Sequence, residues 1–372
     1  MGNFYKRITG PKFAAALILL VLAALVAASV VPQAGDVTPS YLAGWRARSP
    51  FEFAVVDFLQ LDRVYASAWF LTLVSAVFLL LSRTVYMQAR NLLPGRAFSK
   101  EAPAFSKNVL AKWGSVIFHS GLLLVIIAGL ACLCFQKRGF AQVIEGGLLH
   151  GGNRDFATRT LGAFENKFNT GFETGMTKFR CEYRKSGQVK AISSDIVLMD
   201  TAKAKKFTVS ANHPVRFEGV NIYQSFHYGY VLSFVLGKRK SKNGGRGIIT
   251  NFLLDARDKK SEPAVGTSGF PLTPYVFEMR FYPDVTMDTF KLGSPVLYLT
   301  VLERGIPVFS GLVIPGETIP LGRRILIWRL TSMWSGLIYT KGDGMAFAYA
   351  GFCLICLGAA MIYFSPRKKT KA

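Results

Sequence analysis

Residues 114–130 read GSVIFHSGLLLVIIAGL, an apolar run that holds a single ionisable side chain, His119. With the next five residues it is long enough to cross a hydrocarbon core of about 30 Å at about 1.5 Å per helical residue. Three further runs in the chain reach a similar length. The sequence therefore predicts a polytopic α-helical membrane protein with four transmembrane helices, at residues 13–31, 66–87, 114–135 and 345–364.

The formal net charge of +23 is high for a chain that is 51% hydrophobic. Such a charge is typical of proteins that bind nucleic acid, a negatively charged membrane face or an anionic ligand. Here the basic residues bracket the apolar runs, and no nucleic-acid-binding motif accompanies them. We therefore expect the basic residues to interact with the lipid bilayer, and we expect no nucleic-acid partner.

The distribution of lysine and arginine predicts the orientation of the spans, because these residues mark the cytoplasmic side when counted over short loops. They dominate the tails at 1–12 and 365–372 and the loop at 88–113, whereas the loop at 32–65 has three arginines against four acids. We expect a multi-pass protein of the cell (inner) membrane with both termini cytoplasmic and with 32–65 and 136–344 on the extracytoplasmic (periplasmic) side. The alternative that the first span is a cleaved signal peptide is less favoured, because its apolar run is longer than a usual signal core.

The long segment 136–344 reads as β-rich. Alternating and aromatic or β-branched runs are separated by turn signals at Lys185–Gly187, Asn243–Gly244 and Arg304–Gly305. No fixed-period repeat is present. The pattern predicts a large β-rich extracytoplasmic domain between the third and fourth spans, most simply a sandwich or barrel-like domain tethered to the membrane at both ends.

His119 has two interpretations. An ionisable residue about 8 Å inside the core is a functional candidate by default, but an imidazole can also serve as a structural hydrogen-bonding group between helices. A proton relay needs partners, and no other Asp, Glu or His lies in the four predicted spans. A neutral imidazole is also a good iron ligand. With one intramembrane histidine, the second axial ligand of a bis-histidine haem would have to come from another subunit.

The five cysteines give no convincing disulfide framework. Cys353 and Cys356 lie three residues apart in the fourth span, as a membrane dithiol shuttle would require, but the more common interpretation is that both are small packing residues. No CxxCH motif occurs, so the chain does not carry covalently attached haem of the c type.

Several segments together resemble a known family. They are VVPQ (30–33) after the first span, LDRVYASAWFLTL (61–73) entering the second, FHSGLLLVIIAGL (118–130) in the third, two β-rich stretches at 179–198 and 211–229, and SGLIYTKGDG (335–344) before the fourth. In this order they are similar to the ResB-type cytochrome c biogenesis proteins of the system II pathway. Ser82-Arg83 and Gly342-Asp343-Gly344 depart from the family pattern without involving His119.

The resemblance implies cytochrome c biogenesis. It implies a non-autonomous subunit of a cytochrome c haem lyase (synthase) complex, which works with a CcsA/ResC-type membrane partner to move haem b outward and present it to the thiols of apocytochrome c. In that family the histidine of the third span is taken as an axial ligand of the haem iron, and this role transfers to His119. The five tryptophans are scattered, so the chain resembles the unfused subunit.

Two other classes of function stay open on the sequence. One is a membrane thiol-disulfide carrier that uses Cys353 and Cys356. The other is a non-catalytic assembly scaffold in which His119 only holds helices together. For His213 and His227 in the β-rich stretches, a solvated or strand-edge position is the favoured interpretation.

Overall fold

The structure is a computed structural model that describes residues 10–33, 39–92, 109–184, 188–201, 203–238, 247–256, 263–284, 292–342 and 344–365. The chain divides into two compact units. The membrane unit comprises residues 1–137, 160–166 and 342–372, and the β unit comprises 138–159 and 167–341. Residues 1–9 and 366–372 of the predicted tails, the loop around Pro94 and the turns at Lys185–Gly187 and Asn243–Gly244 lie outside the described residues.

The membrane unit contains, within the described residues, four helices that are long and apolar enough to cross a membrane. They are α2 (Pro11–Val30), α5 (Ala68–Arg90), α6 (Val109–Phe135) and α7 (Met345–Tyr363). The prediction of four candidate membrane helices together with a large β-rich domain is therefore confirmed. The third helix begins five residues before the predicted Gly114 and includes Lys112 in its first turns.

The segment predicted as a loop at 32–65 is largely helical. It forms α3 (Pro39–Arg48), α4 (Pro50–Phe58) and the 3-10 helix η1 (Leu61–Ala66). Proline occupies the first position of both α-helices, where its missing N–H has no intrahelical partner to lose and its fixed φ suits the helix. These helices are too short for hydrophobic periodicity alone to reveal them.

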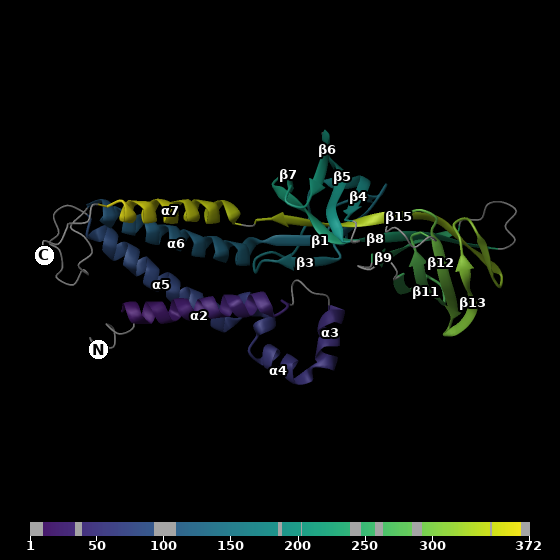
Figure 1. Ribbon diagram of the computed structural model, residues 1–372, viewed down its shortest axis with the longest axis horizontal. Coiled ribbons are helices and arrows are strands. Elements are labelled where there is room, and N and C mark those ends of the chain that lie inside the picture. The colour runs from purple at the N-terminus through teal and green to yellow at the C-terminus, as the bar shows by residue number, and fades with distance from the viewer. Residues whose placement is uncertain are drawn as a thin grey trace. The chain divides into compact units, whose positions relative to one another are not determined.

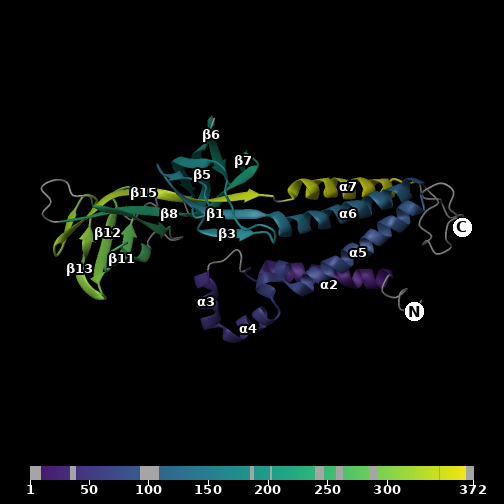
Figure 2. The same cartoon turned by 180° about the vertical axis from the view of Figure 1, so that it is seen from behind.

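Glycines allow α6 and α7 to lie side by side (Figures 1 and 2). A β-carbon at Gly121 would lie 2.7 Å from the Gly351 carbonyl oxygen, and one at Gly114 would lie 2.9 Å from that of Gly358. The two glycines of each helix are seven residues apart, so each pair lies on one face. Small residues of this kind let transmembrane backbones approach closely. We call this contact the glycine seam.

Two further glycines shape the return of the chain into α7. Gly342 and Gly344 have φ of 72° and 61°, in the left-handed region, and Gly344 is the N-cap of α7. β-Carbons there would also lie 2.5 Å from the Phe135 carbonyl oxygen and 2.8 Å from that of Ala128. The closing segment therefore needs glycine at both positions.

The β unit contains three sheets. One has the strand order β3-β1-β15-β8-β7, with β14 paired to β15 and β9 paired to β8; the others run β10-β11-β12-β13 and β2-β4-β5-β6. The strands are β1 Lys137–Ile144, β2 Leu148–Leu149, β3 Thr158–Leu161, β4 Glu173–Tyr183, β5 Val189–Asp200, β6 Lys203–Ser210, β7 Val215–Phe217, β8 Val220–Lys238, β9 Ile248–Asp255, β10 Ala264–Gly269, β11 Tyr275–Tyr282, β12 Val296–Glu303, β13 Ile306–Val313, β14 Thr318–Leu321 and β15 Arg324–Lys341.

The long strands β8 and β15 pair antiparallel and form the spine of the β unit (Figure 1). Near one end of this ribbon, β10–β13 pack over it around a core that includes the fully buried Phe234, Phe277 and Trp328. This half is a sandwich, as predicted. The turn expected at Arg304–Gly305 joins β12 to β13, with φ of 51° and 85°, as a two-residue hairpin turn requires.

Candidate functional site

His119 lies on α6 and its ring is held by the preceding turn of the same helix. Nδ1 is 2.7 Å from the backbone carbonyl oxygen of Ser115 and 3.4 Å from the Ser115 hydroxyl. A carbonyl oxygen only accepts hydrogen bonds, so Nδ1 must carry the proton in this arrangement. The lone pair of the neutral imidazole is then on Nε2. This is the tautomer in which histidine ligates a metal while its other nitrogen is oriented by a hydrogen bond.

The His119 side chain lies away from the glycine seam. Successive residues of an α-helix are about 100° apart, which places His119 about 140° from Gly114 and about 160° from Gly121 around the helix. Both glycines contact α7. The ring is half-buried and packs edge-to-face on Phe118, with 5.6 Å between ring centroids. Nε2 is therefore on the face of α6 opposite to α7.

The described residues do not surround His119 with a complete set of metal ligands. Across these ranges, no group of three or more His, Cys, Asp or Glu side chains is arranged to hold a metal ion. What His119 could offer to an iron is one imidazole nitrogen. A single donor of this kind suits one axial position of a haem.

The structure describes all five cysteines, and none of them forms a disulfide. Cys353 and Cys356 are exposed on α7, whereas Gly351 and Gly358 make the contact with α6. Neither cysteine is therefore packed between α6 and α7, because glycine lets these two helices meet.

The other histidines belong to the β unit. His213 and His227 are exposed, as predicted for solvated positions. His150 Nδ1 is 2.7 Å from Glu173, and this hydrogen bond raises the pKa of His150.

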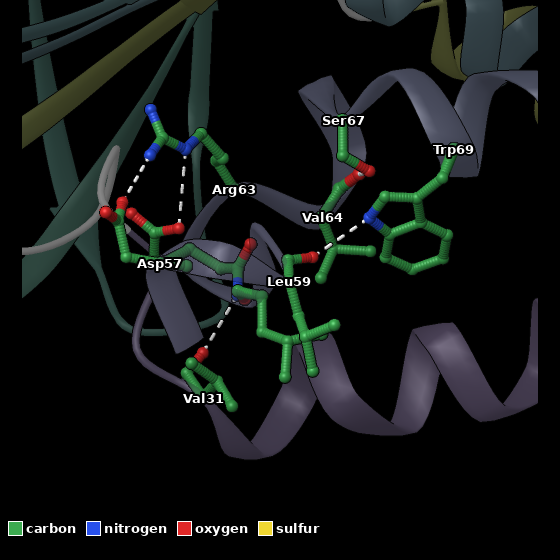
Figure 3. Close-up of polar contacts among 10 residues, drawn as sticks. Val31, Asp57, Leu59, Arg63, Val64, Ser67 and Trp69 are labelled. Atoms are coloured by element: carbon green, nitrogen blue, oxygen red, sulfur yellow. Dashed lines mark hydrogen bonds and ion pairs between the residues drawn. The ribbon is translucent and has the colours of Figure 1, made fainter. Parts of the chain in front are cut away.

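The segments 30–33 and 61–73, quoted for the family resemblance, meet at the entry to α5 (Figure 3). The Gln33 side chain donates to the carbonyl oxygens of Val31 and Leu61, each at 2.9 Å. The Trp69 indole donates to the Leu59 carbonyl oxygen at 3.0 Å. Ser67 caps α5 by accepting from the Phe70 N–H. Gln33 therefore ties the end of α2 to η1, and Trp69 ties the start of α5 to the residues between α4 and η1.

The two β-rich segments also meet. Ser194 of β5 donates to the Gln224 side chain of β8 at 2.8 Å, and the Gln224 amide donates to Ser335 of β15 at 2.7 Å. Ser194 and Ser335 are fully buried. The contact lies where the β8–β15 register shifts, between Ser335 and Leu337. A buried network in which every member is paired fixes one packing of the two sheets.

Comparison with known proteins decides the family. A model of the ResB-like family matches residues 12–94 and 88–262, which is more than half of the chain. The chain belongs to the ResB-like family. The predicted resemblance is therefore confirmed.

Two similar ResB-like relatives carry the description cytochrome c biogenesis protein CcsB. The protein of Gloeobacter violaceus is 24% identical over 411 residues, covering 95% of this chain and 81% of the relative. That of Prochlorococcus marinus (strain MIT 9313) is 24% identical over 424 residues, covering 96% and 87%. A solved cytochrome c haem lyase CcmF aligns with 97% of this chain and 40% of its own at 13% identity, but a TM-score of 0.28 carries no argument about the fold.

Sequence reasoning missed the groups that position His119. Ser115 lies four residues before it, a spacing that places both on one helix face, and this was the available signal. The heptad spacing of Gly114 and Gly121, matched by Gly351 and Gly358, was a second signal. It indicates the glycine seam, which turns the His119 face away from α7. The Ser194–Gln224–Ser335 network had no local signal, because its members are 30 to 141 residues apart along the chain.

Proposed function

We propose that this ResB-like protein acts in cytochrome c biogenesis, as a membrane subunit that carries haem outward and presents it for attachment to apocytochrome c. The observation that carries the proposal is the hydrogen bond from His119 Nδ1 to the Ser115 carbonyl oxygen. With Nδ1 protonated, the lone pair of Nε2 can ligate a metal, and Nε2 lies on a helix face that α7 does not cover. The family and its CcsB relatives support the same role.

In this proposal haem is the cargo, held without a covalent bond. His119 supplies one axial ligand to the iron of haem b through Nε2. The second ligand comes from a membrane partner of the CcsA/ResC type, because the described residues offer no other histidine in a span. Shared ligation makes the chain a subunit of a haem-handling complex and not a haem carrier on its own.

The proposed orientation places the termini and residues 88–113 in the cytoplasm and the β unit on the outer side of the cell (inner) membrane. The asymmetry of lysine and arginine supports it. His119 is then nearer to the cytoplasmic end of α6, where haem enters, and the β unit lies on the side where cytochromes c acquire haem.

Replacing His119 with leucine tests the function. His119→Leu should abolish haem attachment to a reporter cytochrome c while the protein accumulates normally, because leucine is cheaper to insert into a bilayer than an imidazole. His213→Leu, at an exposed histidine of the β unit, is the matched control and should mature cytochromes normally. Normal maturation in the His119→Leu strain would refute the ligand role.

A thiol-disulfide carrier is the second candidate, and one observation favours it. Cys353 and Cys356 are both exposed on α7 and three residues apart. Two accessible thiols on one helix face are what dithiol exchange with a partner requires. The double replacement discussed below separates this candidate from haem transfer.

A further inference from the structure

The β10–β13 sheet has an open edge at β13. β13 is the last strand of this sheet and pairs with β12 alone among the described strands (Figures 1 and 2). The other edge strand, β10, lies against β9, where Gly266 abuts the Leu254 side chain. Edge strands present unpaired N–H and C=O groups that another extended chain can bind. β13 therefore has one free main-chain face.

The side chains of β13 and the following residue make this edge apolar. Ile306, Leu312 and Ile314 are 68%, 65% and 57% exposed, and Val308 is 43% exposed. No charged residue occurs between Gly305 and Gly316. An uncharged, exposed edge of this kind invites the addition of a strand.

Another edge of the same unit shows the opposite treatment. β6 closes the β2-β4-β5-β6 sheet and carries three exposed lysines, Lys203, Lys205 and Lys206. Lysines on an edge strand oppose pairing with another chain. The lysines of β6 thus oppose strand addition at one sheet edge, whereas β13 carries no charged residue that would oppose it.

The part of β13 that can accept a strand is its second half. Pro307 has no N–H, and the register shift at Val301/Leu302 leaves Val308 as a bulge. From Phe309 to Val313 the register with β12 is regular. Phe309 packs on the core of the sandwich, whereas Leu312 is exposed on the other face. An added strand would find apolar contacts on both of its faces.

We propose that the β13 edge binds an extended segment of apocytochrome c by strand addition and holds it while haem is presented. This inference rests on the proposed function. The edge needs a partner with a free, extended main chain, and a cytochrome polypeptide whose thiols must still react with haem is such a partner. Main-chain hydrogen bonds would supply affinity, and the apolar side chains along the edge would select alternate side chains of the segment.

Site-specific crosslinking tests the contact. The photoreactive residue p-benzoylphenylalanine is placed at Leu312 or at the control position Leu272, which is 93% exposed in the turn after β10. The full chain is co-expressed with its membrane partner and an apocytochrome c whose haem-binding cysteines are replaced by serine. The yield of crosslink to the apocytochrome should be about tenfold higher from position 312, the ratio that corresponds to about 1.4 kcal/mol. Equal yields, or crosslinks at 312 to a second copy of the chain or to the membrane partner, would overturn the proposal.

Lysine substitution on β13 tests whether strand addition is needed for cytochrome maturation. Leu312→Lys copies the protection seen on β6 and should lower cytochrome maturation about tenfold, whereas Leu272→Lys should leave it unchanged. His119→Leu is run beside them. Maturation that is lost in His119→Leu but normal in Leu312→Lys would refute strand addition and leave the proposed function standing. Normal maturation in both would refute the proposed function itself.

Discussion

At the scale of single residues, one atom of Ser115 orients the His119 ring more than the other. The backbone carbonyl oxygen lies 2.7 Å from Nδ1, and the hydroxyl lies 3.4 Å from it. The shorter contact is a well-formed hydrogen bond and the longer one is marginal. The tautomer therefore depends on the helix backbone and not on the serine side chain.

We accordingly predict that Ser115→Ala retains at least about half of wild-type maturation, since it removes only the weaker contact. Haem staining of a reporter cytochrome c, normalised to the amount of the protein in membranes, measures this. A loss of maturation as severe as in His119→Leu, at normal accumulation, would show that the hydroxyl does more than the geometry indicates.

The second prediction at the scale of residues concerns the two cysteines of α7. Cys353→Ala with Cys356→Ala should leave maturation intact, because the glycines make the contact with α6 and haem ligation needs no thiol. The same haem-staining assay applies. Maturation lost in the double variant and recovered with an external thiol reductant would favour the dithiol-carrier function instead.

At the scale of elements, the glycine seam sets the position of α6. Gly121→Ala places a β-carbon 2.7 Å from the Gly351 carbonyl oxygen and should destabilise the membrane unit by about 1–3 kcal/mol. Gly129→Ala on the same helix meets nothing within 4 Å and is the matched control. Thermal unfolding in detergent should show a lower midpoint for Gly121→Ala only. Indistinguishable midpoints would mean that the helices do not depend on this contact.

The elements also show what a sequence can predict. The four long helices follow from apolar runs matched to the thickness of a bilayer, a property of each run alone. The hairpin at Arg304–Gly305 follows from residues that tolerate positive φ. The pairing of Gly121 with Gly351, or of Ser194 with Gln224 and Ser335, depends on partners distant along the chain, and local patterns do not contain it. His119 was predictable as a candidate because one ionisable residue in a span is conspicuous; its tautomer required the coordinates.

At the scale of the whole molecule, the proposed orientation is the claim that joins haem entry to cytochrome maturation. Alkaline phosphatase and fluorescent-protein fusions at residues 5, 95, 240 and 370 report it, because phosphatase is active only outside the cytoplasm. We predict active phosphatase at 240 alone and fluorescence at the other three positions, in accord with the distribution of lysine and arginine. Active phosphatase at 95 would contradict this arrangement.

The central claim, ligation of haem iron by His119, is tested most directly by the absorption spectrum of the complex. The protein is purified in detergent with its co-expressed membrane partner, as wild type and as His119→Gly, with and without added imidazole. We predict a low-spin, six-coordinate haem spectrum for wild type, its loss in His119→Gly, and its return with imidazole, which would fill the vacated ligand position. An unchanged low-spin spectrum in His119→Gly without imidazole, at equal haem content and equal copurification of the partner, would contradict it.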